Sequence, residues 1–143
     1  MKTILLWIMV LLTSSTHAID LHTGLNGPWH QPENPGQGLV LHIIPENKQI
    51  FIAWFTYTEA GGQQMWLTAD GSLDAQPIEL TIYESINGKL NSNDPLPDLN
   101  IWGTGSIEFT SCEAASFTFS KTGGQSATIA LSRITAPINC SEV

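Results

Sequence analysis

QIFIAWFTYTEAGGQQMWLTA, residues 49–69, contains the pattern that decides the fold class. Apolar and aromatic side chains alternate with other residues along both arms, and a short segment with Gly61 and Gly62 joins the arms. Period-two alternation is typical of a β-strand, and paired glycines between two such runs indicate a hairpin turn. The stretch therefore predicts an antiparallel hairpin.

The hairpin has two apolar faces. An even-length loop centred on the glycines would place Tyr57 opposite Trp66, a favourable cross-strand aromatic pair, with Phe51 and Phe55 on the same face. The opposite face holds Ile52, Trp54, Met65 and Leu67. One face must be core, and the other is either covered by a second layer or exposed as a binding patch. We expect burial on both sides.

Further period-two runs, bounded by Gly, Asn and Pro, follow the same pattern, and no stretch after residue 18 has a sustained helical period. The seven expected strands cover residues 38–44, 49–58, 65–69, 78–84, 105–112, 116–120 and 126–134. Residues 87–103 form the one long irregular stretch. The expected fold is all-β, a single antiparallel meander of about seven to eight strands forming a sandwich or a small barrel.

A second hairpin is predicted over residues 116–134. An odd-length loop would align Phe117 with Leu131 and Phe119 with Ile129. An even-length loop would shift every pair by one residue and exchange the two faces. We favour the odd loop, in which a glycine forms a bulge.

Residues 1–18 have the pattern of a secretory signal peptide. Lys2 precedes the apolar run 4–12, which is too short to span a bilayer, and Thr16-x-Ala18 fits a cleavage site. We expect cleavage after Ala18 and a periplasmic or secreted protein. Residues 19–143 are long enough for one all-β domain and too short for two.

The chain is acidic, with 5 Lys and Arg against 13 Asp and Glu and a net charge of −8 at pH 7. A nucleic-acid partner is therefore not expected, because few side chains could neutralise phosphates, and stable membrane insertion is not expected either. A cationic protein would be attracted, although acidity also serves solubility. The two cysteines, Cys112 and Cys140, predict one disulfide in an oxidising compartment, which would stabilise the fold by roughly 3 kcal/mol.

Residues 27–38, GPWHQPENPGQG, contain the pattern G-x-W-x-x-P-x-x-x-G-x-G. AWFTYTEAGGQQMWL, GSIEFTSCEAASFTF and SATIALSRI follow it, with a final Cys140. Together these motifs resemble a family of exported bacterial β-domains of uncharacterised function, which combine W-[YF]-T-Y with a later F-x-x-C … L-x-R … C block. The resemblance covers most of residues 24–140 and implies an extracytoplasmic bacterial β-domain. It implies no particular activity.

The same twelve residues allow two interpretations. Trp29 is large enough to cap one end of a sheet core, and the glycines and prolines around it would then form a structural clasp. Alternatively the segment is a rim that faces a ligand. Members of the family that the chain resembles more commonly have an aromatic residue at the position of His30, so a catalytic role for this histidine is not favoured.

No motif for catalysis or metal binding is evident. The histidines lack metal-ligand spacing, residues 91–100 are typical of solvated turns, and no G-x-S-x-G elbow exists. Glu79, Glu84 and Glu108 could supply paired carboxylates for glycoside hydrolysis, but they lie on expected strands, where alternate positions normally put such residues on the solvent face. Arg133 is expected to pair with a carboxylate on a neighbouring strand, or else to capture an anion. We therefore expect no catalytic residue, no metal and no cofactor.

These features favour a non-enzymatic binding or interaction module of the bacterial cell envelope or exterior. Its ligand would be a glycan, a peptide or a protein. The tentative binding residues are Trp29, His30, Trp54, Tyr57, Trp66 and Trp102. Two alternatives remain open. One is an acidic inhibitor of a basic secreted enzyme, for which residues 87–103 would supply a protruding loop, and the other is a small extracytoplasmic hydrolase.

Overall fold

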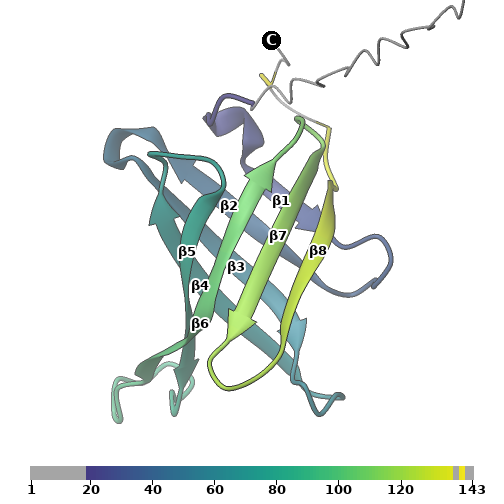
Figure 1. The fold of residues 1–143 in the computed structure, drawn as a ribbon. Coiled ribbons are helices and arrows are strands. Elements are labelled where there is room, and N and C mark those ends of the chain that lie inside the picture. Colours follow the sequence, from purple (N-terminus) through teal and green to yellow (C-terminus); the bar gives the residue numbers. More distant parts are fainter. Residues whose placement is uncertain (1–18, 137–138, 141–143) are drawn as a thin grey trace, which may run out of the picture.

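The computed structural model of the chain describes residues 19–136 and 139–140 (Figure 1). Eight antiparallel strands follow one another around a closed barrel, so the expected all-β meander is confirmed and its form is a barrel. The strands are β1 (Gly27–His30), β2 (Gly38–Ile44), β3 (Gln49–Tyr57), β4 (Gln64–Ser72), β5 (Ile78–Ile86), β6 (Asp98–Phe109), β7 (Ala114–Lys121) and β8 (Ser126–Arg133). The expected signal peptide and its cleavage site lie outside the described residues.

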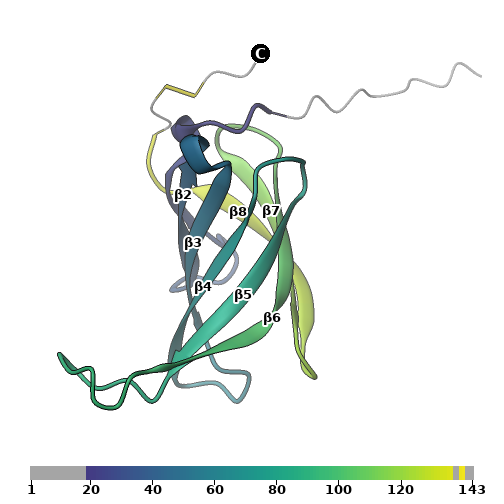
Figure 2. The ribbon, with the colours of Figure 1, turned by 90° about the vertical axis from the view of Figure 1, so that its left-hand side faces the viewer.

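Two short 3₁₀ helices, η1 (Thr23–Leu25) and η2 (Pro45–Asn47), complete the fold. In the part of the chain that the structure describes, no helix is long and apolar enough to cross a membrane. Two expectations need correction. The segment 27–30 is a strand, and residues 98–103 are the start of β6 rather than an irregular loop. Only residues 87–97 connect β5 to β6, and this connection projects from the lower end of the barrel (Figure 2).

The barrel interior is the hydrophobic core, because alternate residues of each strand point inward. In β3, for example, Ile50, Ile52 and Trp54 are buried while Phe51 and Phe55 are exposed. The remaining core side chains come from all the other strands and from η1: Leu25, Trp29, Leu39, Leu41, Ile43, Leu67, Ala69, Ile78, Leu80, Ile82, Trp102, Ile107, Phe109, Ala115, Phe117 and Leu131.

The β3–β4 hairpin has the predicted faces and a different register. Phe55, not Tyr57, lies opposite Trp66, so the expected pairing is wrong by two residues. A shift of two keeps every side chain on its face. The expectation that both faces are buried is also wrong. Trp66 is 55% exposed and Phe55 is 51% exposed, because no second layer covers the outside of the barrel.

The β7–β8 hairpin shows the same kind of difference. Its loop has odd length as expected, but Phe117 pairs with Ile129 and Phe119 with Ala127. The last residue pair of the ladder is Ser120–Ser126, and beyond it the Lys121 N–H donates to the Gln125 carbonyl. Phe117 and Phe119 still share one face, which points into the barrel.

One end of the barrel is closed by η1. The Trp29 indole N–H donates to the Leu25 carbonyl at 3.1 Å, and the Trp29 ring meets Phe109 edge to face. Arg133 donates to the backbone carbonyls of Gly24 and Asn26, at 2.7 and 2.5 Å. The expected carboxylate pair or captured anion at Arg133 is therefore replaced by two backbone acceptors, which attach η1 to β8.

The predicted disulfide between Cys112 and Cys140 is present at this closed end and links the β6–β7 turn to the C-terminal segment. The barrel closes between β1 and β8 through only two residue pairs, Trp29–Arg133 and His30–Ser132. Residues 126–131 of β8 therefore pair with β7 on one edge and have no strand partner on the other within the described residues. The barrel wall therefore lacks strand pairing along this edge of β8 among the described residues.

Candidate functional site

The end of the barrel opposite η1 is open and contains a cavity of about 600 Å³. We call this end the mouth. It is surrounded by the connections 31–37, 58–63, 87–97 and 122–125, and it lies at the bottom of Figure 1. The cavity is lined by Gln31, Asn34, Gln37, Trp54, Thr56, Tyr57, Thr58, Glu59, Met65, Glu84, Trp102, Phe119, Lys121, Gln125, Ala127, Thr128 and Ile129.

The floor of the cavity is aromatic and consists of Trp54, Trp102 and Phe119. The ring centroid of Trp54 lies 5.6 Å from that of Trp102 and 5.0 Å from that of Phe119. Trp54 also meets Phe117 of the core edge to face, at 5.1 Å between centroids. The floor is thus the surface of the packed core that faces the mouth, and contacts between its aromatic rings hold them in place.

A β-bulge directs Trp102 into the cavity. In the β5–β6 ladder Tyr83 pairs with Ile101 and Ile82 pairs with Gly103, so Trp102 is the extra residue. Such bulges locally alter the alternation of side chains and often re-aim one of them. The next residue is glycine because a Cβ at Gly103 would collide with the backbone oxygen of Ser120. The bulge and the glycine together place an indole where a regular strand would not.

The indole N–H groups of Trp54 and Trp102 are available donors. Neither makes a hydrogen bond among the described residues, yet both residues are largely buried, at 5% and 9% exposed. The one buried side-chain nitrogen or oxygen without a partner in residues 19–136 and 139–140 is Nε of Arg133. Both indole nitrogens must therefore keep contact with solvent, and a ligand in the cavity can accept from them.

The segment 27–38 contributes to both ends of the barrel. Trp29 belongs to the core of the closed end, as the clasp interpretation expects, whereas Gln31, Asn34 and Gln37 line the cavity, as the rim interpretation expects. Gln37 is held by the Thr56 hydroxyl, which donates to its side-chain oxygen at 2.6 Å, and this leaves the amide N–H₂ group of Gln37 as a donor.

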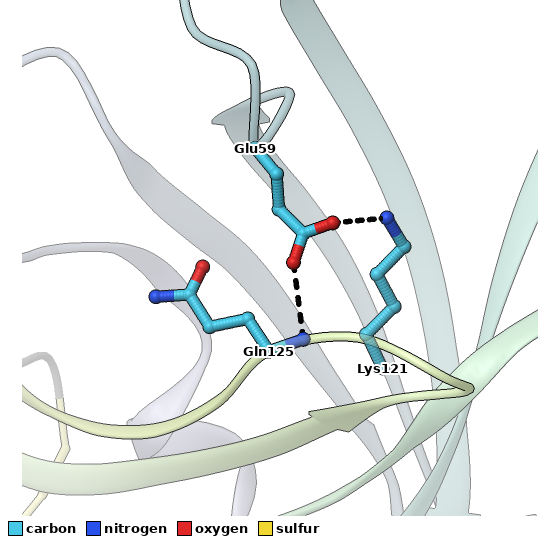
Figure 3. A network of polar contacts seen from close by, with 3 residues as sticks. All are labelled: Glu59, Lys121 and Gln125. Carbon is cyan, nitrogen blue, oxygen red and sulfur yellow. Dashed lines mark hydrogen bonds and ion pairs between the residues drawn. The ribbon is translucent and has the colours of Figure 1, made fainter.

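A charged contact bridges two of the loops around the mouth. Glu59, in the β3–β4 connection, accepts a hydrogen bond from Lys121 Nζ at 2.7 Å and another from the Gln125 backbone N–H at 3.0 Å (Figure 3). The hydrogen bond from Lys121, and then that from Gln125, lower the pKa of the Glu59 carboxyl below its ordinary value. Lys121 Nζ also lies 5.9 Å from the Trp102 ring centroid, near the cavity floor.

The six residues tentatively expected to bind lie in different parts of the barrel. Trp54, Tyr57 and Trp102 line the cavity. Trp29 is fully buried at the closed end, where no ligand in the mouth can reach it. Trp66 lies on the outer surface, and His30 is half-buried between β2 and β8 without contributing to the cavity lining.

Trp66 belongs to an aromatic patch on the outer surface of β3 and β4. We define this outer patch as Phe51, Phe55 and Trp66, each about half exposed. The outer surface of β7 and β8 is different, since Thr118 pairs with Thr128 through a hydroxyl hydrogen bond of 2.9 Å, and a serine pair repeats the contact further along. The outer patch is therefore confined to one side of the barrel.

Reasoning from sequence missed part of the cavity. Phe119 could have been assigned to it, because it alternates with the buried Phe117 and lies nearer the mouth. The contact between Glu59 and Lys121 gave no local signal, since the two residues are 62 positions apart and belong to different hairpins. Only the closure of the barrel brings these loops together.

The titratable side chains that line the cavity are Tyr57, Glu59, Glu84 and Lys121. Glu84 makes no hydrogen bond or ion pair to the described residues, whereas Glu59 and Lys121 hold each other. Across residues 19–136 and 139–140, no three His, Cys, Asp or Glu side chains group closely enough to hold a metal ion. The geometry offers an aromatic surface, several amide and hydroxyl groups and one ammonium group.

Comparisons of the chain with protein-family models, with curated proteins and with solved structures found no match.

Proposed function

We propose that this chain is an exported, non-enzymatic binding protein that holds a small organic molecule in the mouth of its barrel. The observation that carries the proposal is the 600 Å³ cavity with Trp54, Trp102 and Phe119 as its floor. Ligand pockets typically have volumes of about 300 to 1,000 Å³ and combine apolar walls with a few polar groups. This cavity has that size and that composition.

The lining indicates the chemistry of the ligand. Flat, apolar ligand surface would stack on the indole rings, as aromatic rings and the faces of sugars do. Two indole N–H groups and the amides of Gln31, Asn34, Gln37 and Gln125 supply hydrogen bonds from the floor and the walls. We therefore expect a ligand with one planar or apolar face and several hydrogen-bonding groups, in keeping with the small glycans and peptides that the sequence suggests.

The proposed location is the periplasm or the exterior of a bacterial cell. The Cys112–Cys140 disulfide supports it, because such bonds persist mainly in oxidising compartments. The signal-peptide pattern of residues 1–18 supports it independently.

The test is a fluorescence titration with a panel of neutral aromatic amides, of which dansylglycinamide is the first. Binding of this probe is measured as energy transfer from tryptophan to the dansyl group. Binding should weaken about tenfold in Trp102→Leu, a change equal to about 1.4 kcal/mol. Trp66→Leu is the matched control, because it removes an equally large ring from the outer surface. Binding that depends on Trp66 and not on Trp102, or no binding by any member of the panel, would contradict the proposal.

A second candidate function uses the outer patch. Phe51, Phe55 and Trp66 form an exposed aromatic surface, and such surfaces are frequent contact sites for proteins and glycans. The alternative of an acidic inhibitor is compatible with the exposed β5–β6 connection, where Leu90 is 96% exposed. In either case the Trp66→Leu variant or a deletion within residues 87–97 would abolish binding to the partner, and ligands of the cavity would not compete.

A further inference from the structure

The carboxylate of Glu59 lies in a site that would suit the carboxylate of a ligand. One oxygen accepts from the Lys121 ammonium at 2.7 Å and the other from the Gln125 backbone N–H at 3.0 Å (Figure 3). A cation and a backbone N–H that converge on one carboxylate form an anion site, and this holds whether the carboxylate belongs to the protein or to a ligand. All three residues line the cavity.

This anion site is adjacent to the aromatic floor. Lys121 Nζ lies 5.9 Å from the centroid of Trp102, which in turn contacts Trp54 and Phe119. Lys121 ends β7 and Gln125 immediately precedes β8, so the hairpin fixes the Gln125 N–H and the backbone from which the Lys121 side chain extends. A molecule bound at the site could therefore extend directly from the ammonium group onto the rings.

Glu59, in contrast, lies in the β3–β4 loop, whose ends are joined by a hydrogen bond from the Thr58 N–H to the Gln63 carbonyl. Residues 58–63 contain Gly61 and Gly62, both with positive φ, and a Cβ added at either would meet nothing within 4 Å. Both Glu59 and Lys121 are also partly exposed, with 43% and 32% of the side-chain surface accessible. An exposed ion pair contributes little to stability, so a competing carboxylate can displace Glu59 at small cost.

The charges of the lining favour an anion at this position only. Lys121 is the sole cationic side chain that lines the cavity. Glu84, the other carboxylate of the lining, comes from β5 and forms no ion pair with Lys121, whose ion pair is with Glu59. Displacement of Glu59 would leave the ammonium group beside an aromatic floor without a partner, unless the ligand supplies a negative group.

We propose that Lys121 and the Gln125 backbone N–H form a carboxylate-binding subsite, which Glu59 occupies as an internal substitute for the ligand. The ligand class is then an amphipathic carboxylic acid whose apolar, planar part lies on Trp54, Trp102 and Phe119. This inference rests on the proposed function and specifies its ligand. Glu59 makes the subsite selective for such acids, since only a molecule that binds both the aromatic rings and the Lys121 ammonium group displaces the Glu59 carboxylate.

The test compares two probes that differ in one group, dansylglycine with its carboxylate and dansylglycinamide with a neutral amide. Both are titrated into the full chain and into three variants, Glu59→Gln, Glu84→Gln and Lys121→Met. Glu59→Gln and Glu84→Gln each remove one negative charge from the cavity lining, but only the first frees Lys121. The measured quantity is the ratio of the two dissociation constants in each protein.

Glu59→Gln should strengthen binding of dansylglycine about tenfold while the amide changes less than about twofold, because a charged competitor is lost. Glu84→Gln should change the ratio by less than about threefold, because it alters only the net charge of the cavity and leaves the Glu59–Lys121 ion pair intact. Lys121→Met should bring the ratio close to one. Binding of the amide in every variant also shows that the cavity remains folded.

Equal ratios in all four proteins, with both probes bound, would overturn the carboxylate subsite and leave the binding cavity in place. Equal gains in Glu59→Gln and Glu84→Gln would also overturn it, because general electrostatics would then suffice. If neither probe binds to any of the proteins, the proposed function fails and this inference fails with it.

Discussion

The indole rings of Trp54 and Trp102 meet edge to face, with their centroids 5.6 Å apart and their planes at 88°. Trp54 reaches this contact by the regular alternation of β3, and Trp102 reaches it through a bulge in β6. The pair marks the boundary between a packed barrel core and an open cavity. Under the proposed function, replacement of either ring should therefore affect both stability and ligand binding.

Replacement of Trp54 should destabilise the protein strongly. Its ring contacts Trp102, Phe117 and Phe119, so Trp54→Ala should lower the free energy of unfolding by about 3 to 5 kcal/mol. Trp66→Ala, on the exposed outer patch, should lower it by less than about 1 kcal/mol. Urea denaturation of both variants measures the difference, and equal losses would mean that Trp54 is not part of the core.

Gly103 should not tolerate a side chain. A Cβ there would collide with the Ser120 carbonyl oxygen of the neighbouring strand, so Gly103→Ala should destabilise the chain by about 1 to 3 kcal/mol. The same change should alter the near-ultraviolet circular dichroism, because Trp102 precedes this glycine in the bulge. Gly88→Ala is the control, since its nearest neighbour would be Pro97 Cβ at an ordinary 3.5 Å. Equal behaviour of the two variants would contradict the bulge as the device that positions Trp102.

Arg133 should contribute to stability through its geometry more than through its charge. It donates to the carbonyls of Gly24 and Asn26 and lies 5.6 Å from the Trp29 ring, and burial lowers the pKa of its guanidinium group. Arg133→Lys keeps the charge but not the two-pronged donor, and should cost about 1 to 3 kcal/mol.

The control for Arg133 is Lys48→Met, which removes a cation from a well-exposed pair with Asp74, 3.7 Å apart. Such a pair contributes between about 0 and 1 kcal/mol. Thermal or urea denaturation measures both variants. If Arg133→Lys has the same free energy of unfolding as the unchanged protein, the positive charge alone is sufficient for the contribution of Arg133 to stability.

Loss of the disulfide should destabilise the closed end of the barrel. The cross-link joins residues 28 positions apart, so the chain-entropy model gives about 3 to 4 kcal/mol for the double variant Cys112→Ser, Cys140→Ser. The midpoint of urea denaturation should fall accordingly. Because the cavity lies at the opposite end, ligand binding below the transition should not change. An unchanged midpoint would contradict the prediction.

The Glu59–Lys121 contact should depend on pH in a defined direction. The pKa of Glu59 is lowered in the folded protein, so the carboxylate is favoured, and the contact is intact at pH values above the ordinary range of a carboxyl group. Its contribution is lost as the pH falls through the lowered pKa. Carboxyl-detected NMR titration should place the pKa of Glu59 below its ordinary value, and Lys121→Met should raise it. An identical titration curve in the two proteins would contradict this contact.

The fold class and the division of strand residues between two faces could be predicted from sequence, because alternation depends only on neighbours along the chain, but which face of the 49–69 hairpin is core could not. Ile52, Trp54 and Leu67 were placed on one face correctly even though the hairpin register differs by two residues. Loop length decides that register, and paired glycines do not determine loop length. The bulge at Trp102 could not be predicted, since it is a shift in the pairing between β5 and β6 and leaves no signal in the local sequence.

The cavity was beyond prediction for a related reason. It exists because β1 ends at His30 while β8 continues along the mouth, and because core side chains fill only one end of the barrel. Both conditions depend on closure between the first and last strands. The exposure of the outer patch follows from the same architecture, since the core lies inside the barrel and Phe51 and Phe55 point away from it.

The most direct test of the cavity as a ligand site is a two-dimensional ¹H–¹⁵N NMR spectrum of the tryptophan indole N–H groups, recorded while the panel of aromatic amides and dansylglycine is added. The indole signals of Trp54 and Trp102 should shift on binding, because both residues line the cavity and neither N–H group has a hydrogen-bond partner among the described residues. Those of Trp29 and Trp66 should stay in place. A shift of Trp66 with Trp54 and Trp102 unchanged would contradict the account and assign binding to the outer patch.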